Sequence, residues 1–99
     1  MRNLDKFKNL LKRELEVTEI KHFCDSDERG MELYFHPFSK YAFENFRIWF
    51  WDNKGKDIST KKAFTNPKKY IAHTGWNRGV TIKVNRLLRK FGFVIWRSH

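Results

Sequence analysis

Hydrophobic residues repeat with a helical period at both ends of this chain and with a period of two between them. In residues 4–16, apolar side chains spaced three and four positions apart form one face of an amphipathic helix, for which Asn3 is the expected N-cap. Residues 80–91 show the same spacing, and Gly92 follows where helices commonly end. This order predicts helices that flank a sheet.

Short extended segments lie between and after these helices. Alternating or β-branched runs predict strands over residues 17–24, 31–36, 43–51 and 93–97. Asn66 and Pro67 are typical of an N-cap and a first helical position, so a short helix is expected from Pro67 to about His73. The sequence therefore predicts an α+β fold: a small antiparallel sheet of three to five strands, with an N-terminal amphipathic helix and a C-terminal helix pair plus strand.

The length of 99 residues is enough for one domain with one core. The single cysteine, Cys24, excludes an intramolecular disulfide and favours a reducing compartment. The charged N-terminus does not resemble a signal peptide, and the longest apolar run is too short to span a bilayer. We therefore expect a single domain, 1–99, that is cytoplasmic, nuclear or in a host cytoplasm, and neither secreted nor bound to a membrane.

The charge is divided unequally along the chain. Residues 1–50 contain nine Lys or Arg and nine Asp or Glu, whereas residues 51–99 contain twelve and two, so the second half carries the whole formal charge of +10. Such an excess opposes folding by self-repulsion and favours a polyanionic partner. We expect a neutral scaffold in residues 1–58, a basic half in residues 59–99, and a non-enzymatic nucleic-acid-binding function that needs no cofactor. DNA and RNA, single- or double-stranded, all fit this charge.

The helix at residues 80–91 is the expected docking element. Its wheel places Lys83, Arg86, Arg89 and Lys90 on one face, with Ile82 among them. Arg86 and Arg89 are the best candidates to contact base edges, while the other cations would contact phosphates. The expected nucleic-acid-binding residues are Lys61, Lys62, Lys68, Lys69, Trp76, Arg78, Lys83, Arg86, Arg89 and Lys90.

Two resemblances follow from the order of elements. The predicted helix from residue 67, the break at 75–79 and the helix and strand after it resemble a helix-turn-helix with one wing strand, as in winged-helix domains. That resemblance implies a recognition helix in the major groove. One helix, three strands and a later basic segment at 59–64 resemble the double-stranded RNA-binding fold.

Trp49 and Trp51 share a strand face with Arg47. Exposed, this face would form a platform for base stacking. We expect instead that one of the two amphipathic helices covers it, because a sheet of this size needs a packed face. Trp76, in a glycine-flanked loop, is the favoured aromatic contact.

Two other functions remain open. A short, basic chain of this kind also fits a phage-type modulator that binds an acidic surface or a nucleic-acid-processing complex of the host. A metal-independent, toxin-like ribonuclease would need an acid/base pair, for which His22 and His36 on neighbouring strands are the candidates. No metal-ligand spacing is present in the sequence. The apolar segment 43–51 is the expected pairing edge if a homodimer forms.

Overall fold

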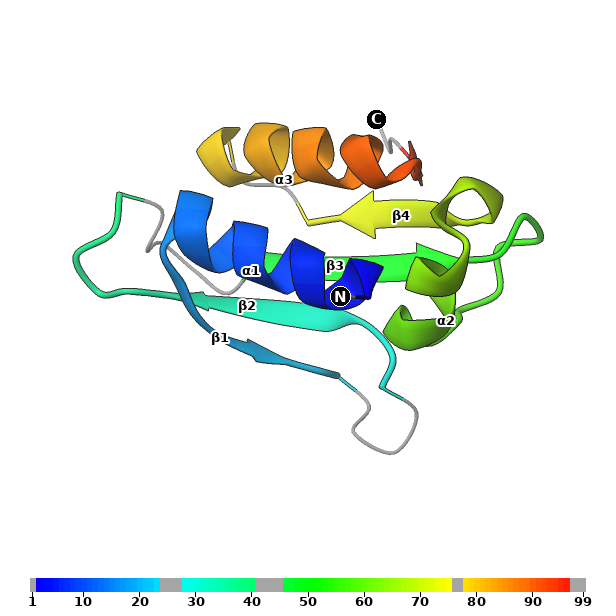
Figure 1. Cartoon of the computed structure of the whole chain (residues 1–99), viewed down its shortest axis with the longest axis horizontal. Coiled ribbons are helices and arrows are strands. Elements are labelled where there is room, and N and C mark those ends of the chain that lie inside the picture. Colours follow the sequence, from blue (N-terminus) through cyan, green and yellow to red (C-terminus); the bar gives the residue numbers. More distant parts are fainter. Residues whose placement is uncertain (1, 24–27, 41–45, 76–77, 97–99) are drawn as a thin grey trace.

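A computed structural model describes residues 2–23, 28–40, 46–75 and 78–96, without the side chain of Arg78. Five strands form one sheet in the order β1-β2-β3-β4-β5, in which the first four are antiparallel and β5 is parallel to β4 (Figure 1). The elements are α1 (Asn3–Leu15), β1 (Val17–Lys21), β2 (Met31–Phe35), β3 (Phe46–Trp51), α2 (Thr60–Thr65), the 3-10 turn η1 (Pro67–Lys69), β4 (Ile71–Thr74), α3 (Arg78–Phe91) and β5 (Val94–Ile95). The predicted α+β class is confirmed. The last strand is parallel because α3 provides the long crossover that a parallel pair requires.

The N-terminal helix forms where its apolar period predicts it. Phe7, Leu11 and Leu15 are buried on one face of α1. The expected N-cap is wrong, because Arg2 holds that position without a side-chain cap, and the Asn3 amide donates to the Phe64 carbonyl oxygen at 3.4 Å. At the other end, Glu16 adopts the left-handed conformation and ends the helix.

The segment around residues 60–74 differs most from its prediction. Ser59 caps α2 by accepting a hydrogen bond from the Lys62 N–H at 3.1 Å. The proline turn η1 is only three residues long, and the chain then enters β4 instead of continuing as a helix to His73. The helix-turn-helix pattern is therefore wrong here, because a strand that pairs with β3 separates α2 from α3. Pairing with the backbone of β3 outweighs the weak helical signal of this segment.

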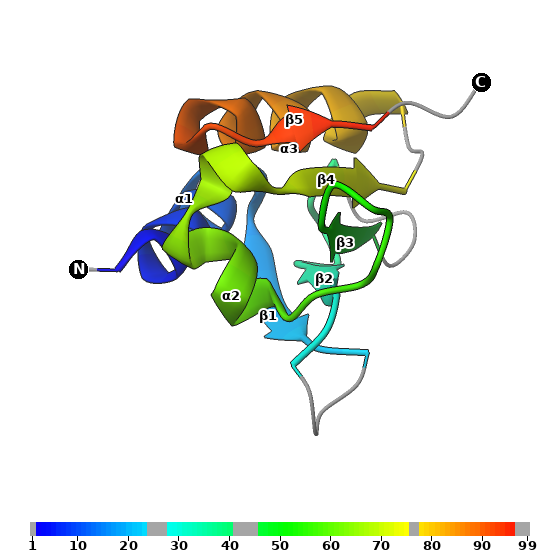
Figure 2. The ribbon, with the colours of Figure 1, turned by 90° about the vertical axis from the view of Figure 1, so that its right-hand side faces the viewer.

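One hydrophobic core lies between the helices and one face of the sheet. The three helices lie together on that side of the sheet. Figure 2 shows α1 and α2 beside β2 and β3, and α3 next to β4 and β5. Aromatic rings connect the layers: Phe64 of α2 lies 5.1 Å from Phe7, 5.4 Å from Phe50 and 4.9 Å from Phe93, measured between ring centroids. The core therefore joins all three helices, including the end of α3, to β3.

The central place of β3 corrects a second expectation. This strand pairs with β2 through Met31↔Ile48 and with β4 through Trp49↔His73, so neither of its edges is free to pair with another copy. The first residues of the predicted segment, 43–45, lie outside the described residues. The outer strands of the sheet are β1 and β5.

Candidate nucleic-acid interface

Basic residues are concentrated in the helical layer of the fold, whereas the charges on the strands are balanced. The four helical segments contain thirteen Lys or Arg and two Asp or Glu, whereas the five strands contain two of each. The helical cations are Lys6, Lys8, Lys12, Arg13, Lys61, Lys62, Lys68, Lys69, Arg78, Lys83, Arg86, Arg89 and Lys90. The helical layer is therefore the electropositive side of the molecule, and it includes α1 from the neutral half of the sequence.

The third helix has the two faces that its wheel predicts. Val80, Val84 and Leu88 are buried, with at most 1% of their surface exposed. The four basic side chains on the other face are all exposed: Lys83, Arg86, Arg89 and Lys90. Ile82 is 61% exposed among them, so this face also presents an apolar contact.

Other predicted cations extend this surface toward the C-terminal end of α3. A methyl group built on Gly92 would lie 2.9 Å from Cγ of Lys68, which places η1 against the last turn of α3.

The remaining predicted cations lie on α2 and η1 or outside the described residues. Lys61 and Lys62 are exposed on α2, and Lys61 lines a hollow with Arg2 and Asp5 at the start of α1. Lys69 is exposed, with its ammonium 5.8 Å from the ring centre of Tyr70. Trp76 and the side chain of Arg78 lie outside the described residues.

The opposite face of the sheet carries aromatic rings, and the expectation that a helix covers them is wrong. All three described helices pack on the other face, which carries Ile48 and Phe50, whereas Trp49 and Trp51 alternate with these residues along β3 and lie on the open face. Trp49 and Trp51 are only half-buried and are absent from the hydrophobic core. The helices instead cover Phe46, Ile48 and Phe50 of the same strand, because successive side chains of a strand point to opposite faces.

These rings form a continuous array across the sheet, here called the ring platform: Phe23, Trp49, His73, Trp51 and Trp96. Phe23 stacks on Trp49 with centroids 5.3 Å apart, and His73 stacks on both Trp49 at 5.5 Å and Trp51 at 5.0 Å. Trp96 meets Trp51 edge-on at 5.4 Å. The two ends are the most exposed, with 38% of Phe23 and 44% of Trp96 accessible.

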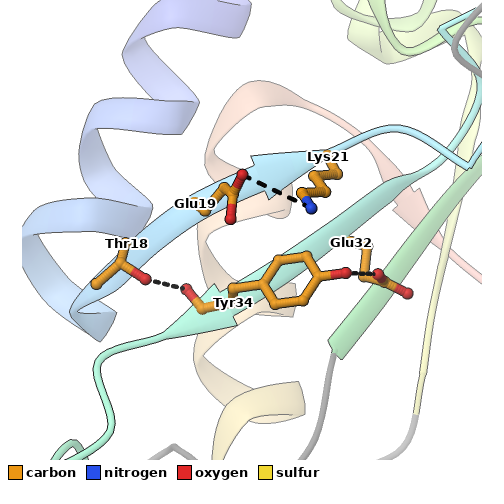
Figure 3. Close-up of polar contacts among 5 residues, drawn as sticks. All are labelled: Thr18, Glu19, Lys21, Glu32 and Tyr34. Carbon is orange, nitrogen blue, oxygen red and sulfur yellow. Dashed lines mark hydrogen bonds and ion pairs between the residues drawn. The ribbon is translucent and has the colours of Figure 1, made fainter.

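Polar groups border the ring platform along β1 and β2. The Arg47 guanidinium lies 4.8 Å from the ring centre of Phe23 and donates to the Glu32 carboxylate at 3.0 Å. The Tyr34 hydroxyl donates to the same carboxylate, as Figure 3 shows.

The hydrogen bond between Tyr34 and Glu32 shifts the pKa of both groups. It lowers the pKa of Glu32, an effect that burial opposes and Arg47 strengthens, and it raises the pKa of Tyr34. Lys21 lies over the Tyr34 ring at 5.2 Å and pairs with Glu19 at 3.8 Å.

The candidate acid/base pair is not formed. The hairpin of β1 and β2 exists, but its register pairs Lys21 with Glu32 and Val17 with Phe35. His22 and His36 therefore lie at opposite ends of the hairpin, about 16 Å apart at about 3.3 Å per residue. The Nδ1 atom of His22 lies 2.9 Å from the Gly30 carbonyl oxygen, and that of His36 accepts from the Phe38 N–H at 3.2 Å. These positions overturn the histidine pair of the ribonuclease hypothesis.

Sequence patterns identified part of the ring platform but not its extent. Trp49, Trp51 and Arg47 share a face by simple alternation, whereas Phe23, His73 and Trp96 join them only through the sheet order. His73 lay in the segment predicted to be helical, which hid its place on β4. Burial among these rings lowers the pKa of its imidazole, which favours the neutral form of His73.

The described residues contain no cluster of three His, Cys, Asp or Glu that could hold a metal ion. Nor does that part of the chain include a helix long and apolar enough to cross a membrane. No protein-family model matches this sequence, and searches among curated proteins and solved structures also find no match. No match therefore indicates what either surface binds.

Proposed function

We propose that this protein is a small, non-enzymatic nucleic-acid-binding protein that docks through its helical layer, with α3 as the principal element. The observation that carries the proposal is the separation of charge between the layers, with thirteen basic and two acidic residues on the helical segments. Self-repulsion within one layer disfavours folding, whereas a polyanion on that surface relieves it. Nucleic acid is the polyanion that an array of this kind most commonly meets.

The residues of α3 have distinct expected roles. Lys83 and Lys90 are point charges suited to phosphate oxygens. Arg86 and Arg89 present planar guanidinium groups that can contact phosphate or the acceptor atoms of guanine, and Ile82 can contact a thymine methyl. The buried side of α3 packs into the core, so these side chains project from a fixed support. Their exposure leaves them accessible to a ligand without local unfolding.

A nucleic-acid-binding function implies residence in the cytoplasm or nucleus. The single cysteine supports a reducing compartment, since the chain cannot form an intramolecular disulfide.

Salt dependence tests the proposal directly. If about six cations contact duplex phosphates, the logarithm of the binding constant should fall with the logarithm of salt concentration at a slope near −5. The double substitution Arg86→Gln with Arg89→Gln should weaken binding and reduce the magnitude of this slope by about two. Fluorescence anisotropy with a labelled duplex, titrated at several salt concentrations, measures both quantities.

The matched control is Lys54→Gln with Lys56→Gln, which removes the same charge from an exposed turn outside the helical segments. The proposal predicts a larger loss for the α3 variant than for this control. Equal losses would show that net charge alone attracts the probe. Weak binding of the wild-type protein to every nucleic acid would contradict the proposal and direct attention to an acidic protein partner.

A further inference from the structure

We propose that the ring platform on the open face of the sheet binds unpaired bases, so that the nucleic acid bound there is single-stranded. This inference rests on the proposed function and specifies a second surface and its ligand class. It begins from the five rings, which follow one another across β3, β4 and the chain segments beside them.

The sheet fixes the rings before any ligand arrives. Trp49 pairs with His73 across β3 and β4, and both strands are internal to the sheet. The interplanar angles are 18° for Phe23–Trp49, 27° for Trp49–His73 and 21° for Trp51–His73, so the central rings are nearly parallel. Each of these rings therefore packs its flat face on a neighbour and is held in place. A base would stack on the partly exposed rings at the two ends, Phe23 and Trp96, without first having to order them.

The net charge of the whole protein favours a nucleic acid over a second copy of this chain. Two copies would bring formal charges of +10 together, which opposes association through this face. A single strand combines flat rings that stack on Trp or Phe with a phosphate backbone that the positive protein attracts. Arg47 lies against Phe23 at one end of the ring platform and is paired there with Glu32.

The same geometry disfavours a duplex on this face. Bases in a duplex stack on one another, so their flat surfaces are not available to a sheet. The exposed ends of the ring platform, Phe23 and Trp96, offer ring surface to bases that are already unstacked. Binding to the helical layer does not require unpaired bases, so the two surfaces can be distinguished by the type of probe.

The test compares a fluorescein-labelled oligothymidylate with a duplex of the same length by anisotropy at fixed salt. Phe23→Ala and Trp96→Ala remove partly exposed rings from the two ends of the platform. Phe38→Ala is the matched control, because Phe38 is 93% exposed and its described ring contact is with His36, outside the platform. Urea unfolding of each variant verifies that it folds.

Each platform variant should weaken binding of the oligothymidylate by at least about fivefold, since one base stack contributes about 1–3 kcal/mol. Binding of the duplex should be unchanged, and the control should match the wild type on both probes. Unchanged oligothymidylate binding by the platform variants, or an equal loss on both probes, would overturn the inference but leave the proposed function in place. If the wild type bound neither the oligothymidylate nor the duplex, the result would instead refute the proposed function, and this inference with it.

Discussion

The imidazole of His73 stacks on the indole of Trp51, with ring centroids 5.0 Å apart and planes inclined by 21°. The same imidazole also stacks on Trp49, with centroids 5.5 Å apart. Packing against these rings removes part of the water around the imidazole, and the loss of hydration disfavours the charged imidazolium. The lowered pKa of His73 follows from this burial.

We expect stability to depend on pH through His73. Its folded pKa lies below the ordinary value of 6.5, so over the interval between the two the unfolded state binds more protons. The free energy of unfolding should therefore fall as the pH decreases below the ordinary histidine pKa of 6.5. His73→Phe keeps an aromatic ring but cannot titrate, and should have a flatter profile. Urea unfolding at several pH values measures this difference, and parallel profiles would contradict it.

Phe64 joins the helices to the sheet, so its truncation should be severe. Its ring is 4% exposed. It contacts the rings of Phe7 in α1, Phe50 in β3, and Phe91 and Phe93 on either side of Gly92. We expect Phe64→Ala to reduce the free energy of unfolding by about 3–5 kcal/mol, measured by urea denaturation. Phe38→Ala, which removes a 93% exposed ring, should cost less than about 0.5 kcal/mol. Similar losses in the two variants would show that Phe64 is not a core residue.

Gly92 ends α3 with a φ of 108° and lies close to Lys68. We expect Gly92→Ala to destabilise the protein by about 1–3 kcal/mol, because the methyl group would strain the backbone and lie 2.9 Å from Cγ of Lys68. Gly55→Ala is the matched comparison, since Gly55 has a φ of 83° but no atom within 4 Å of the added methyl. A larger loss at Gly92 in urea denaturation would confirm the close contact, and equal losses would exclude it.

The Glu32 carboxylate raises the pKa of Tyr34 by accepting its hydroxyl hydrogen bond. Glu32→Gln removes the negative charge that opposes formation of the phenolate. The tyrosine absorbance titration should then contain a component that moves to lower pH, and this component should be absent when Tyr34→Phe is added. A titration that Glu32→Gln leaves unchanged would contradict the assigned contact.

Local periodicity was sufficient for the elements whose burial repeats along the sequence. The structure places helices at Asn3–Leu15 and Arg78–Phe91, close to the predicted 4–16 and 80–91, and confirms strands over most of 17–24, 31–36 and 43–51. The basic face of α3 also follows from its wheel, because its buried and exposed positions both repeat with the helical period.

Long-range pairing determined what local patterns did not show. β4 is only four residues long, and the polar His73 and Thr74 gave it no strand-like alternation of apolar residues. Its conformation comes from pairing with β3 on one side and β5 on the other. The ring platform depends on this pairing, since His73 connects Trp49 to Trp51 and Trp96. Trp49 and Trp51 thus face away from the helices for a reason that lies outside their own segment.

The excess of cations on the helical segments over the strands contributes an electric dipole directed across the sheet. Near a polyanion, the field exerts a torque that turns the helices toward it before any contact forms. This orientation acts on the association rate, which long-range charge raises and added salt lowers. Redistributing cations from the helices to the strands would preserve the formal charge of +10 yet weaken this alignment. The first encounter is thus governed by where the charge lies as well as by how much there is.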